Sequence, residues 1–527
     1  MHFELPYPSR RAPLMARNVV ATSQPLAAQA GLRMLLAGGN AVDAALAAAI
    51  ALTVVEPTGN GLGSDAFAVL WDGAALHGLN ASGRSPAGWT PDRFAAGSTM
   101  PERGWESVTV PGAVSGWVAL SDRFGALPFP DLFAPAIAYA RDGFAVSPII
   151  ARLWKLGGAT LSDQPGFADC FLPDGRAPRA GETFRNPALA QTLERIAHTR
   201  GAAFYTGDIA ELIAQESARH GAALTSEDLA AHHVDWCGTL RQSYAGIDLH
   251  EIPPNGQGIA ALIALGILGH HDLAALDPDD PQALHLQIEA VKLGLADAEA
   301  FVGDPDAMAT PAEALLSPAY LGQRAALIHA RKASLATHGA PRAGGTVYVT
   351  AADAAGRMVS LIQSNYMGFG AGVVVPGTGI HLQNRGAGFA TTPGHPNRVG
   401  PRKRPFHTII PGFVTRDGRP EMSFGVMGGP MQAQGHVQMV TRTMVHGQSP
   451  QAASDAPRWR FVSGRRVAVE PAMPDATVKA LQQMGHEIVH DPPDNSFGFG
   501  GAQLIARHGG GYVAGSDHRK DGCAVGY

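Results

Sequence analysis

The 527-residue chain has only three cysteines and few charged side chains. Cys170, Cys237 and Cys523 lie far apart and follow no disulfide or metal-ligand spacing, so the sequence favours reduced, buried thiols over a disulfide. Charged residues make up 16% of the chain and the net charge is −5, which gives no reason to expect nucleic acid as a partner. The length allows one very large domain or about two to four ordinary ones.

Long apolar runs are also missing. The first 27 residues contain no run that could serve as the hydrophobic region of a signal peptide. The most hydrophobic window, residues 41–57, is interrupted by Asp43 and is too short to cross a bilayer, so it predicts a buried helix. We therefore expect a soluble, cytoplasmic protein that does not bind a membrane.

Acidic residues are absent from one long stretch, residues 354–416. Two interpretations stay open for this basic span: it lines an anion-binding cleft, or acids from elsewhere in the fold neutralise it. Its basic residues are Arg357, Arg385, Arg398, Arg402, Lys403, Arg404 and Arg416.

The remaining pattern predicts a mixture of helices and antiparallel strands. Residues 66–71 and 75–80 each have the alternating pattern of a strand, and Asp72-Gly73 lies between them, which is typical of a β-hairpin. Residues 130–330 are mostly helical, with amphipathic runs at 187–199 and 281–302. Residues 322–345 indicate a helix that ends in an exposed connector, and from residue 346 short strands predominate, with one helix near 472–485. The fold class is α+β, and the main boundary falls at 345/346.

The stretch "GGTVYVTAADAAGRMVSLIQSN" (344–365) predicts two strands joined by a turn at 354–357, with Thr346 at the start. An ordinary strand threonine is one interpretation. The other is a nucleophile freed by cleavage after Gly345, because an N-terminal threonine has a hydroxyl and an α-amine of pKa roughly 8 that can act as its base. The turn would pair Thr346 near Asn365 and leave Ser364 within reach of its hydroxyl. Spacing alone favours the ordinary threonine.

Other motifs give weaker signals. The glycines of "GNGLGS" (59–64) precede a strand instead of opening a helix, which argues against a dinucleotide site. The pairs His232/His233 and His270/His271 lack a partner at helical spacing for a metal. No metal and no organic cofactor is expected.

Seven sequence blocks, taken in order, carry a family resemblance. They are "AGGNAVDAALAAAIALTVVEPTGNGLGSDAFAVLWDG" (37–73), "TVPGAVSGW" (109–117), "TVYVTAADAAGRMVSLIQSN" (346–365), "GFGAGVVVPGTGIHLQNRGAGF" (368–389), "GPRKRPFHTIIPGF" (400–413), "GVMGGP" (425–430) and "GSDHRKDGCAVGY" (515–527). With them the chain resembles the γ-glutamyltransferase (glutathione hydrolase) family of N-terminal nucleophile (Ntn) hydrolases, which includes cephalosporin-acylase-like members.

This resemblance implies an αββα sandwich, with two antiparallel sheets flanked by helices. It implies a precursor that cleaves itself between Gly345 and Thr346 into a large subunit, 1–345, and a small subunit, 346–527, which together form one domain. Thr346 would be the nucleophile, Ser364 its supporting hydroxyl, and Gly428 and Gly429 the backbone oxyanion hole.

The substrate-binding positions depart from the family pattern. Where family members have the acid that holds a substrate ammonium group, this chain has Gly388. Where they have a neighbouring neutral amide, it has Arg385. Where family members have the serine pair that holds a substrate carboxylate, this chain has His407 and Thr408. The family's arginine at that site aligns with Ser82. The candidate substrate-binding residues are therefore Ser82, Arg84, Tyr366, Arg385, His407 and Thr408. Arg84 is included because residues i and i+2 of an extended segment share a face.

The implied function is cleavage of γ-glutamyl-type amides, such as those of glutathione, through a Thr346 acyl-enzyme. The alternative is an acylase or amidase for a non-amino dicarboxylic acid amide of glutaryl or cephalosporin type, or for another small acid amide. An unprocessed, non-enzymatic binding protein is a third interpretation. Expected partners are the small amide substrate and the two cleaved subunits, with a dimer of heterodimers as a further expectation.

Overall fold

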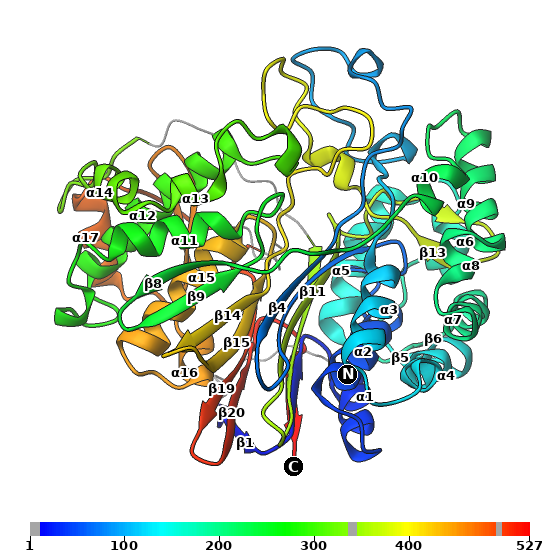
Figure 1. Cartoon of the computed structure of the whole chain (residues 1–527), viewed down its shortest axis with the longest axis horizontal. Helices are drawn as coiled ribbons and strands as arrows, with labels where there is room; N and C mark the ends of the chain where they lie inside the picture. Colours follow the sequence, from blue (N-terminus) through cyan, green and yellow to red (C-terminus); the bar gives the residue numbers. More distant parts are fainter. Residues whose placement is uncertain (1–10, 336–344, 492–497) are drawn as a thin grey trace.

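The structure is a computed structural model that describes residues 11–335, 345–491 and 498–527. Two seven-stranded antiparallel sheets lie face to face between two layers of helices (Figure 1). The first sheet has the order β1 (Leu14–Ala16), β20 (Gly511–Ser516), β19 (Gly501–His508), β15 (Arg419–Met427), β14 (Gly412–Arg416), β9 (Ile247–Glu251) and β8 (Leu240–Tyr244). The second has the order β21 (Cys523–Gly526), β2 (Val19–Thr22), β10 (Gly345–Ala352), β11 (Met358–Tyr366), β3 (Asp65–Trp71), β4 (Leu76–Ala81) and β7 (Asp235–Trp236).

Strand β10 shows how the sequence builds these layers. Its side chains alternate, so Tyr348 and Ala352 join the apolar layer between the sheets while Val347 and Val349 pack toward the helices. Every residue of β10 is buried because both faces of its sheet are covered. The αββα sandwich expected from the resemblance is confirmed.

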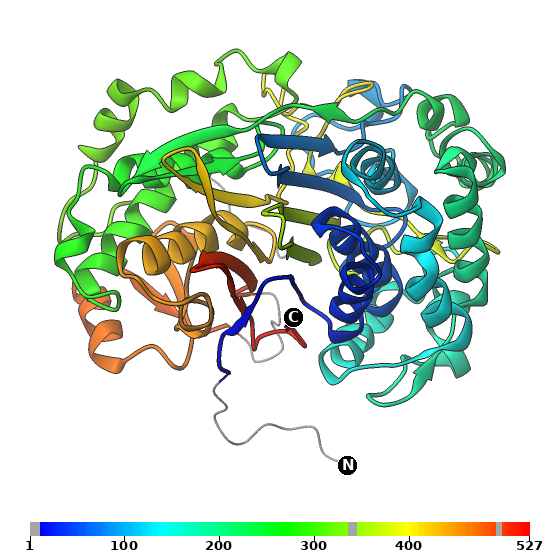
Figure 2. The same ribbon diagram turned by 60° about the horizontal axis from the view of Figure 1, so that its bottom comes forward.

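Helices of both outer layers come from stretches of the sequence far apart. Helices α1 (Pro25–Leu36) and α2 (Ala41–Val55) lie beside the second sheet, and α11 (Gly258–Leu268), α12 (Pro281–Phe301) and α15 (Met431–Val440) lie beside the first (Figures 1 and 2). All residues of α2 are buried, as predicted, and Asp43 starts the helix because its carboxylate accepts the N–H of Asn40 at 2.8 Å in a capping box. Among the described residues no helix is long and apolar enough to cross a membrane.

Several predicted elements are confirmed, and others were missed. The β3–β4 hairpin, α7 (Pro187–Thr199), α12 and α17 (Asp475–Gln483) lie where the sequence predicted them. The expectation of a single helix after residue 346 was wrong, because α15 and α16 (Pro450–Asp455) also form there. The hairpin β8–β9 falls inside the stretch predicted as mostly helical. All three cysteines are free, as favoured, but each is only partly buried.

The hairpin β10–β11 sets the position of Thr346. Gly345 pairs with Tyr366 and Val347 with Gln363, so the ladder is irregular at Thr346. The predicted turn at 354–357 is confirmed by the Gly356 N–H, which donates to the carbonyl of Asp353 at 2.9 Å. Helix α14 (Pro318–Ala325) ends before the predicted connector, whose residues 336–344 lie outside the described part.

Candidate active site

Thr346 lies at the start of β10 with its hydroxyl against the peptide bond that precedes it. Its Oγ1 donates to the carbonyl oxygen of Gly345 at 2.7 Å and lies 3.2 Å from the Oγ of Ser364. Ser364 Oγ also donates to the Gly345 carbonyl, at 2.6 Å. Two hydroxyls therefore converge on one carbonyl group, the group that Thr346 must attack to cleave the chain behind itself.

Arg385 lies next to this pair of hydroxyls. Its Nη2 donates to Ser364 Oγ at 3.1 Å and its Nη1 donates to Thr408 Oγ1 at 2.8 Å. The side chain is fully buried, its Nε has no partner, and no carboxylate of a described residue forms an ion pair with it. Burial lowers the pKa of Arg385 to about 10, which leaves it protonated at neutral pH. The site thus contains a positive charge bonded only to neutral hydroxyls.

Tyr366 covers this guanidinium. The Arg385 Cζ lies 4.4 Å from the centre of the Tyr366 ring, a cation–π distance. Tyr366 has φ +77°, an uncommon value for a residue with a Cβ, because the chain turns sharply at the end of β11. Its N–H donates to Ser364 Oγ at 2.8 Å, so the same turn orients the serine.

A buried acid–imidazole pair lies behind the arginine. Asp65 accepts N–H groups from Gly83 at 3.0 Å and Gly112 at 3.1 Å, and His407 Nε2 lies 3.1 Å from its second oxygen. Burial raises the pKa of Asp65 to about 7 although Arg385 opposes the shift. Burial and the charge of Arg385 hold the pKa of His407 well below its usual value, so the ring is neutral.

Gly428 and Gly429 lie between β15 and the N-terminus of α15. Their φ values of +122° and +60° are in the region that favours glycine, and neither N–H donates to another described residue. Gln257 fixes this turn, because its Nε2 donates to the carbonyls of Gly429 at 2.9 Å and of Thr408 at 2.6 Å. Two backbone donors at a helix N-terminus can stabilise an oxyanion.

The structure leaves little space for a side chain at residue 388, where the family acid is missing. A Cβ added to Gly388 would lie 2.8 Å from the carbonyl oxygen of Phe406. Asn397 holds these two segments together, since its Nδ2 donates to the Gly388 carbonyl at 2.6 Å and its Oδ1 accepts the Phe406 N–H at 2.8 Å. The backbone at this position therefore excludes a larger side chain.

Ser82 and Arg84 do not join Thr346 and Arg385. Ser82 Oγ donates to Asn80 at 2.7 Å and is fully buried. Arg84 lines a separate cavity with His232 and lies 3.8 Å from Asp235. The structure thus brings Thr408, Tyr366 and Arg385 to the nucleophile and leaves Arg84 elsewhere.

Some residues of the basic span 354–416 are paired with acids, and one of them, Arg385, lies at the candidate site. Arg404 pairs with Asp235, and its N–H donates to Asp304 at 2.7 Å. Arg357 and Arg416 lie near Asp353 and Glu421. The acids at Arg404 come from other segments, whereas Asp353 and Glu421 flank the basic span. Arg385 is the member that reaches the candidate site.

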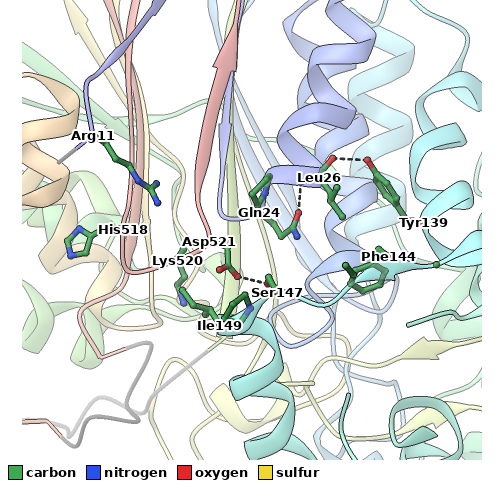
Figure 3. A pocket seen from close by; sticks show the side chains of 14 residues that line it. Arg11, Gln24, Leu26, Tyr139, Phe144, Ser147, Ile149, His518, Lys520 and Asp521 are labelled. Atoms are coloured by element: carbon green, nitrogen blue, oxygen red, sulfur yellow. Dashed lines mark hydrogen bonds between the residues drawn. The ribbon is translucent and has the colours of Figure 1, made fainter. Parts of the chain in front are cut away.

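Two cavities differ in their relation to the site. One of about 280 Å³ is bordered by Tyr366, Gly388, Thr408 and Pro430, next to the residues described above. A larger one of about 720 Å³ shares no lining residue with it and lies where Arg11 and Lys520 face Leu26 and Phe144 (Figure 3). None of the candidate site residues lines the larger cavity.

One cluster has metal-ligand residue types. His285, Glu289 and His486 are buried and their ligand atoms lie within 4.8 Å of one another. His285 Nδ1 is hydrogen-bonded to His486 Nε2 at 2.8 Å, and Glu289 is paired with the Lys292 ammonium at 2.6 Å. His486 Nδ1 has no partner among the described residues, but the lysine charge opposes a cation there.

Two contributors were missed from the sequence. Asp65 stood inside a quoted block as a strand residue, and Gln257 stood in no motif at all. For Asp65 the signal was an acid between "GNGLGS" and an apolar strand. The role of Gln257 in fixing the glycine turn is identified by its contact with Gly429, and no sequence signal predicts it.

Comparisons with known proteins identify the family of the chain. Residues 27–527 match the family described as Gamma-glutamyltranspeptidase. The oxamate amidohydrolase proenzyme of Klebsiella pneumoniae is 38% identical over 95% of this chain and 97% of its own, and the glutathione hydrolase-like YwrD proenzyme of Bacillus subtilis is 36% identical over 97% and 100%. A solved cephalosporin acylase from Bacillus halodurans covers 100% of this chain and 99% of its own, with TM-score 0.95 and 45% identity. The chain therefore belongs to the γ-glutamyltranspeptidase family of Ntn hydrolases, enzymes of amide hydrolysis and acyl transfer.

Proposed function

We propose that this protein is a self-processing amidohydrolase for amides of short acids, in which the acyl part carries a carboxylate and no α-amine. The observation that carries the proposal is Arg385, a buried guanidinium bonded only to the hydroxyls of Ser364 and Thr408 beside the nucleophile. Asp65, whose pKa lies near 7, compensates this buried cation only in part at neutral pH, which favours a bound anion. A substrate carboxylate is the anion that this position suits.

Processing begins with Thr346 Oγ. The hydroxyl attacks the Gly345 carbonyl carbon, and the developing oxyanion receives the hydrogen bond from Ser364. The C–N bond breaks as the nitrogen takes a proton, which leaves an ester between Gly345 and the Thr346 side chain. This break also frees the α-amine of Thr346, and water then hydrolyses the ester, which releases the Thr346 hydroxyl and the Gly345 carboxylate. The products are the segments 1–345 and 346–527, which stay associated in one sandwich.

In turnover the same hydroxyl attacks a substrate amide. The free α-amine, with a pKa of roughly 8, takes the hydroxyl proton and passes it to the leaving amine. The N–H groups of Gly428 and Gly429 stabilise the tetrahedral oxyanion, a contribution of about 3–4 kcal/mol for one such donor. Water, or an acceptor amine, then releases the acyl group.

The position of Arg385 limits the length of the acyl group. Thr346 Oγ is 3.2 Å from Ser364 Oγ, which is 3.1 Å from Arg385 Nη2, so the guanidinium lies at most about 6 Å from the nucleophile. A carboxylate bonded directly to the attacked carbonyl, or a few bonds away, fits that separation once the Tyr366 ring turns aside. The oxamate amidohydrolase relative supports this, since oxamate joins an amide to a carboxylate.

Cleavage of γ-glutamyl amides is the second candidate. Relatives named glutathione hydrolase favour it, and Glu299 supplies an exposed carboxylate at the cavity that could pair with an α-ammonium group. Against it stands Gly388, where the backbone excludes the acid, and the charge of Arg385, which repels an ammonium group. The site therefore supports the amine-free acyl group better.

One comparison of substrates tests the proposal. Processed protein is assayed with oxamate, a glutaryl anilide and a γ-glutamyl anilide, with kcat/KM measured for each. We expect turnover of the two amine-free acids to exceed that of the γ-glutamyl compound. Arg385→Gln should raise KM for the carboxylate substrates, and Arg416→Gln, paired with Glu421 at the surface, should not. A large preference for γ-glutamyl anilide would overturn the proposal.

A further inference from the structure

The cavity beside the nucleophile has room that a small acid does not use. We infer that it receives the amine half of the scissile amide, so that the preferred substrates are N-aryl or similarly bulky N-substituted amides instead of primary amides. This inference rests on the proposed function, because the acyl half is taken to lie at Arg385. It concerns the opposite half of the substrate, which no comparison identifies for this chain.

The borders of the cavity include residues that contact Arg385 or adjoin the oxyanion glycines in sequence. Thr408, which bonds Arg385, and Tyr366, which covers that guanidinium, form its inner edge. Pro430 directly follows the oxyanion glycines and forms another border. An amide held with its carboxylate at Arg385 and its oxygen at Gly428 and Gly429 has only its nitrogen substituent left to direct into this space.

One wall of the cavity is apolar. It consists of side chains from helix α12, from the segment after the 3₁₀ turn η7 (Arg385–Gly388), and from strand β16 (Trp459–Ser463). Its apolar members are Leu295, Ala298, Val302, Phe389, Phe406 and Phe461. An NH₂ group alone would leave this wall in contact with water, whereas a ring would bury it.

The size of the cavity agrees with one ring and its substituents. Its volume is about 280 Å³, close to the lower end of the roughly 300–1,000 Å³ of small-molecule pockets. Replacement of water by an aromatic ring on such a wall typically improves binding on the order of 10- to 100-fold.

The polar edge of the cavity limits the charge of that ring. Glu299 is exposed there, and His395, whose pKa burial lowers, is neutral at pH 7. Lys403, whose charge also lowers the pKa of His395, donates to the carbonyls of Pro396 and Arg398. The amine half is therefore neutral or cationic, and a carboxylate on it would face Glu299.

A matched pair of substrates tests the inference. Oxamate and its N-phenyl derivative, oxanilate, share one acyl group and differ only on the amine side. Leu295→Phe narrows the cavity from helix α12, and Leu293→Phe, two residues away and outside the cavity, is the control. We expect Leu295→Phe to lower the ratio of kcat/KM for oxanilate to kcat/KM for oxamate about tenfold or more, and Leu293→Phe to leave this ratio unchanged. Equal effects of Leu295→Phe on both substrates would overturn the inference.

A binding measurement separates this inference from the proposed acyl group. Aniline is titrated into processed protein by calorimetry, together with 4-aminobenzylamine and 4-aminobenzoate. We expect aniline to bind, 4-aminobenzylamine to bind more tightly, 4-aminobenzoate more weakly, and Leu295→Phe to weaken all three. If neither oxamate nor oxanilate is hydrolysed but these amines bind as expected, the acyl assignment fails and the cavity assignment stands. If Leu295→Phe leaves amine binding unchanged, the cavity assignment is wrong whatever the acyl group.

Discussion

Arg385 donates a hydrogen bond to Ser364 Oγ at 3.1 Å, and this hydroxyl in turn donates to the Gly345 carbonyl at 2.6 Å. The positive charge thus acts, through one hydroxyl, on the carbonyl that Thr346 must attack. A charge-assisted donor is roughly twice as strong as a neutral one. The same arginine therefore has two roles, one in processing and one in substrate binding.

Replacement of Ser364 should slow processing more than it unfolds the protein. Ser364→Ala removes the donor to the Gly345 carbonyl and leaves Arg385 with one hydroxyl partner. By analogy with the loss of an oxyanion-hole donor, we expect cleavage to slow by about 10²–10³-fold. The measurement is the rate of appearance of two fragments on a denaturing gel. Ser364→Thr, which keeps the hydroxyl, should cleave faster than Ser364→Ala, and equal rates would contradict the role of the hydroxyl.

Replacement of Arg385 should affect both steps. Arg385→Gln removes the charge that polarises Ser364 and the anchor for a carboxylate, so we expect slower processing and a raised KM. Arg385→Lys keeps a charge but cannot reach both Ser364 and Thr408, so its effects should be intermediate. Processing is followed on gels and KM with oxamate. An unchanged KM in Arg385→Gln would remove the arginine from substrate binding.

The affinity for anions should fall as the pH rises through about 7. Burial raises the pKa of Asp65 to about 7, so the carboxyl is neutral below this pH and negative above it. Its charge then opposes a substrate carboxylate at the neighbouring Arg385. We expect the inhibition constant of a non-reactive short dicarboxylate to increase severalfold between pH 6 and pH 8. Inhibition is measured instead of kcat because the Thr346 amine also titrates in this range. Asp65→Asn should reduce the dependence to the part that the Thr346 amine contributes, and an unchanged dependence would exclude Asp65 as a cause.

Restoration of the family acid should not create γ-glutamyl activity. Gly388→Asp places a Cβ 2.8 Å from the Phe406 carbonyl, so we expect a lower Tm and no gain with γ-glutamyl anilide. The control is Gly510→Asp, where a Cβ meets no atom within 4 Å. A variant with unchanged Tm and new γ-glutamyl activity would show that the missing acid alone sets the specificity.

The sequence predicts the hairpin at Thr346 well because its information is local. Alternation and a glycine turn fix the register of β10 and β11, and that register alone brings Ser364 to Thr346. The buried helix α2 could be predicted equally well, since thirteen of the fifteen residues that follow a capping asparagine are apolar. The β8–β9 hairpin was missed because its short strands lie within a long helical region, and tertiary pairing with β14 decides their state.

The electrostatics of the site could not be derived from spacing. Asp65 and His407 are 342 residues apart in sequence, and their contact follows from the packing of two sheets. The spacing predicted that Arg84 substitutes at the site, yet Arg84 lines another cavity and lies 3.8 Å from Asp235. Long-range packing therefore decides which arginine reaches the nucleophile.

Self-cleavage by Thr346 is the central claim, and one experiment tests it most directly. The purified chain and its Thr346→Ala variant are run on a denaturing gel, and the smaller band is sequenced from its N-terminus. The wild-type chain should give two bands, with the smaller beginning Thr-Val-Tyr-Val, and the variant should stay at 54.8 kDa without amidase activity. An intact wild-type chain that still hydrolyses amides, or a cleaved and active Thr346→Ala variant, would contradict the claim.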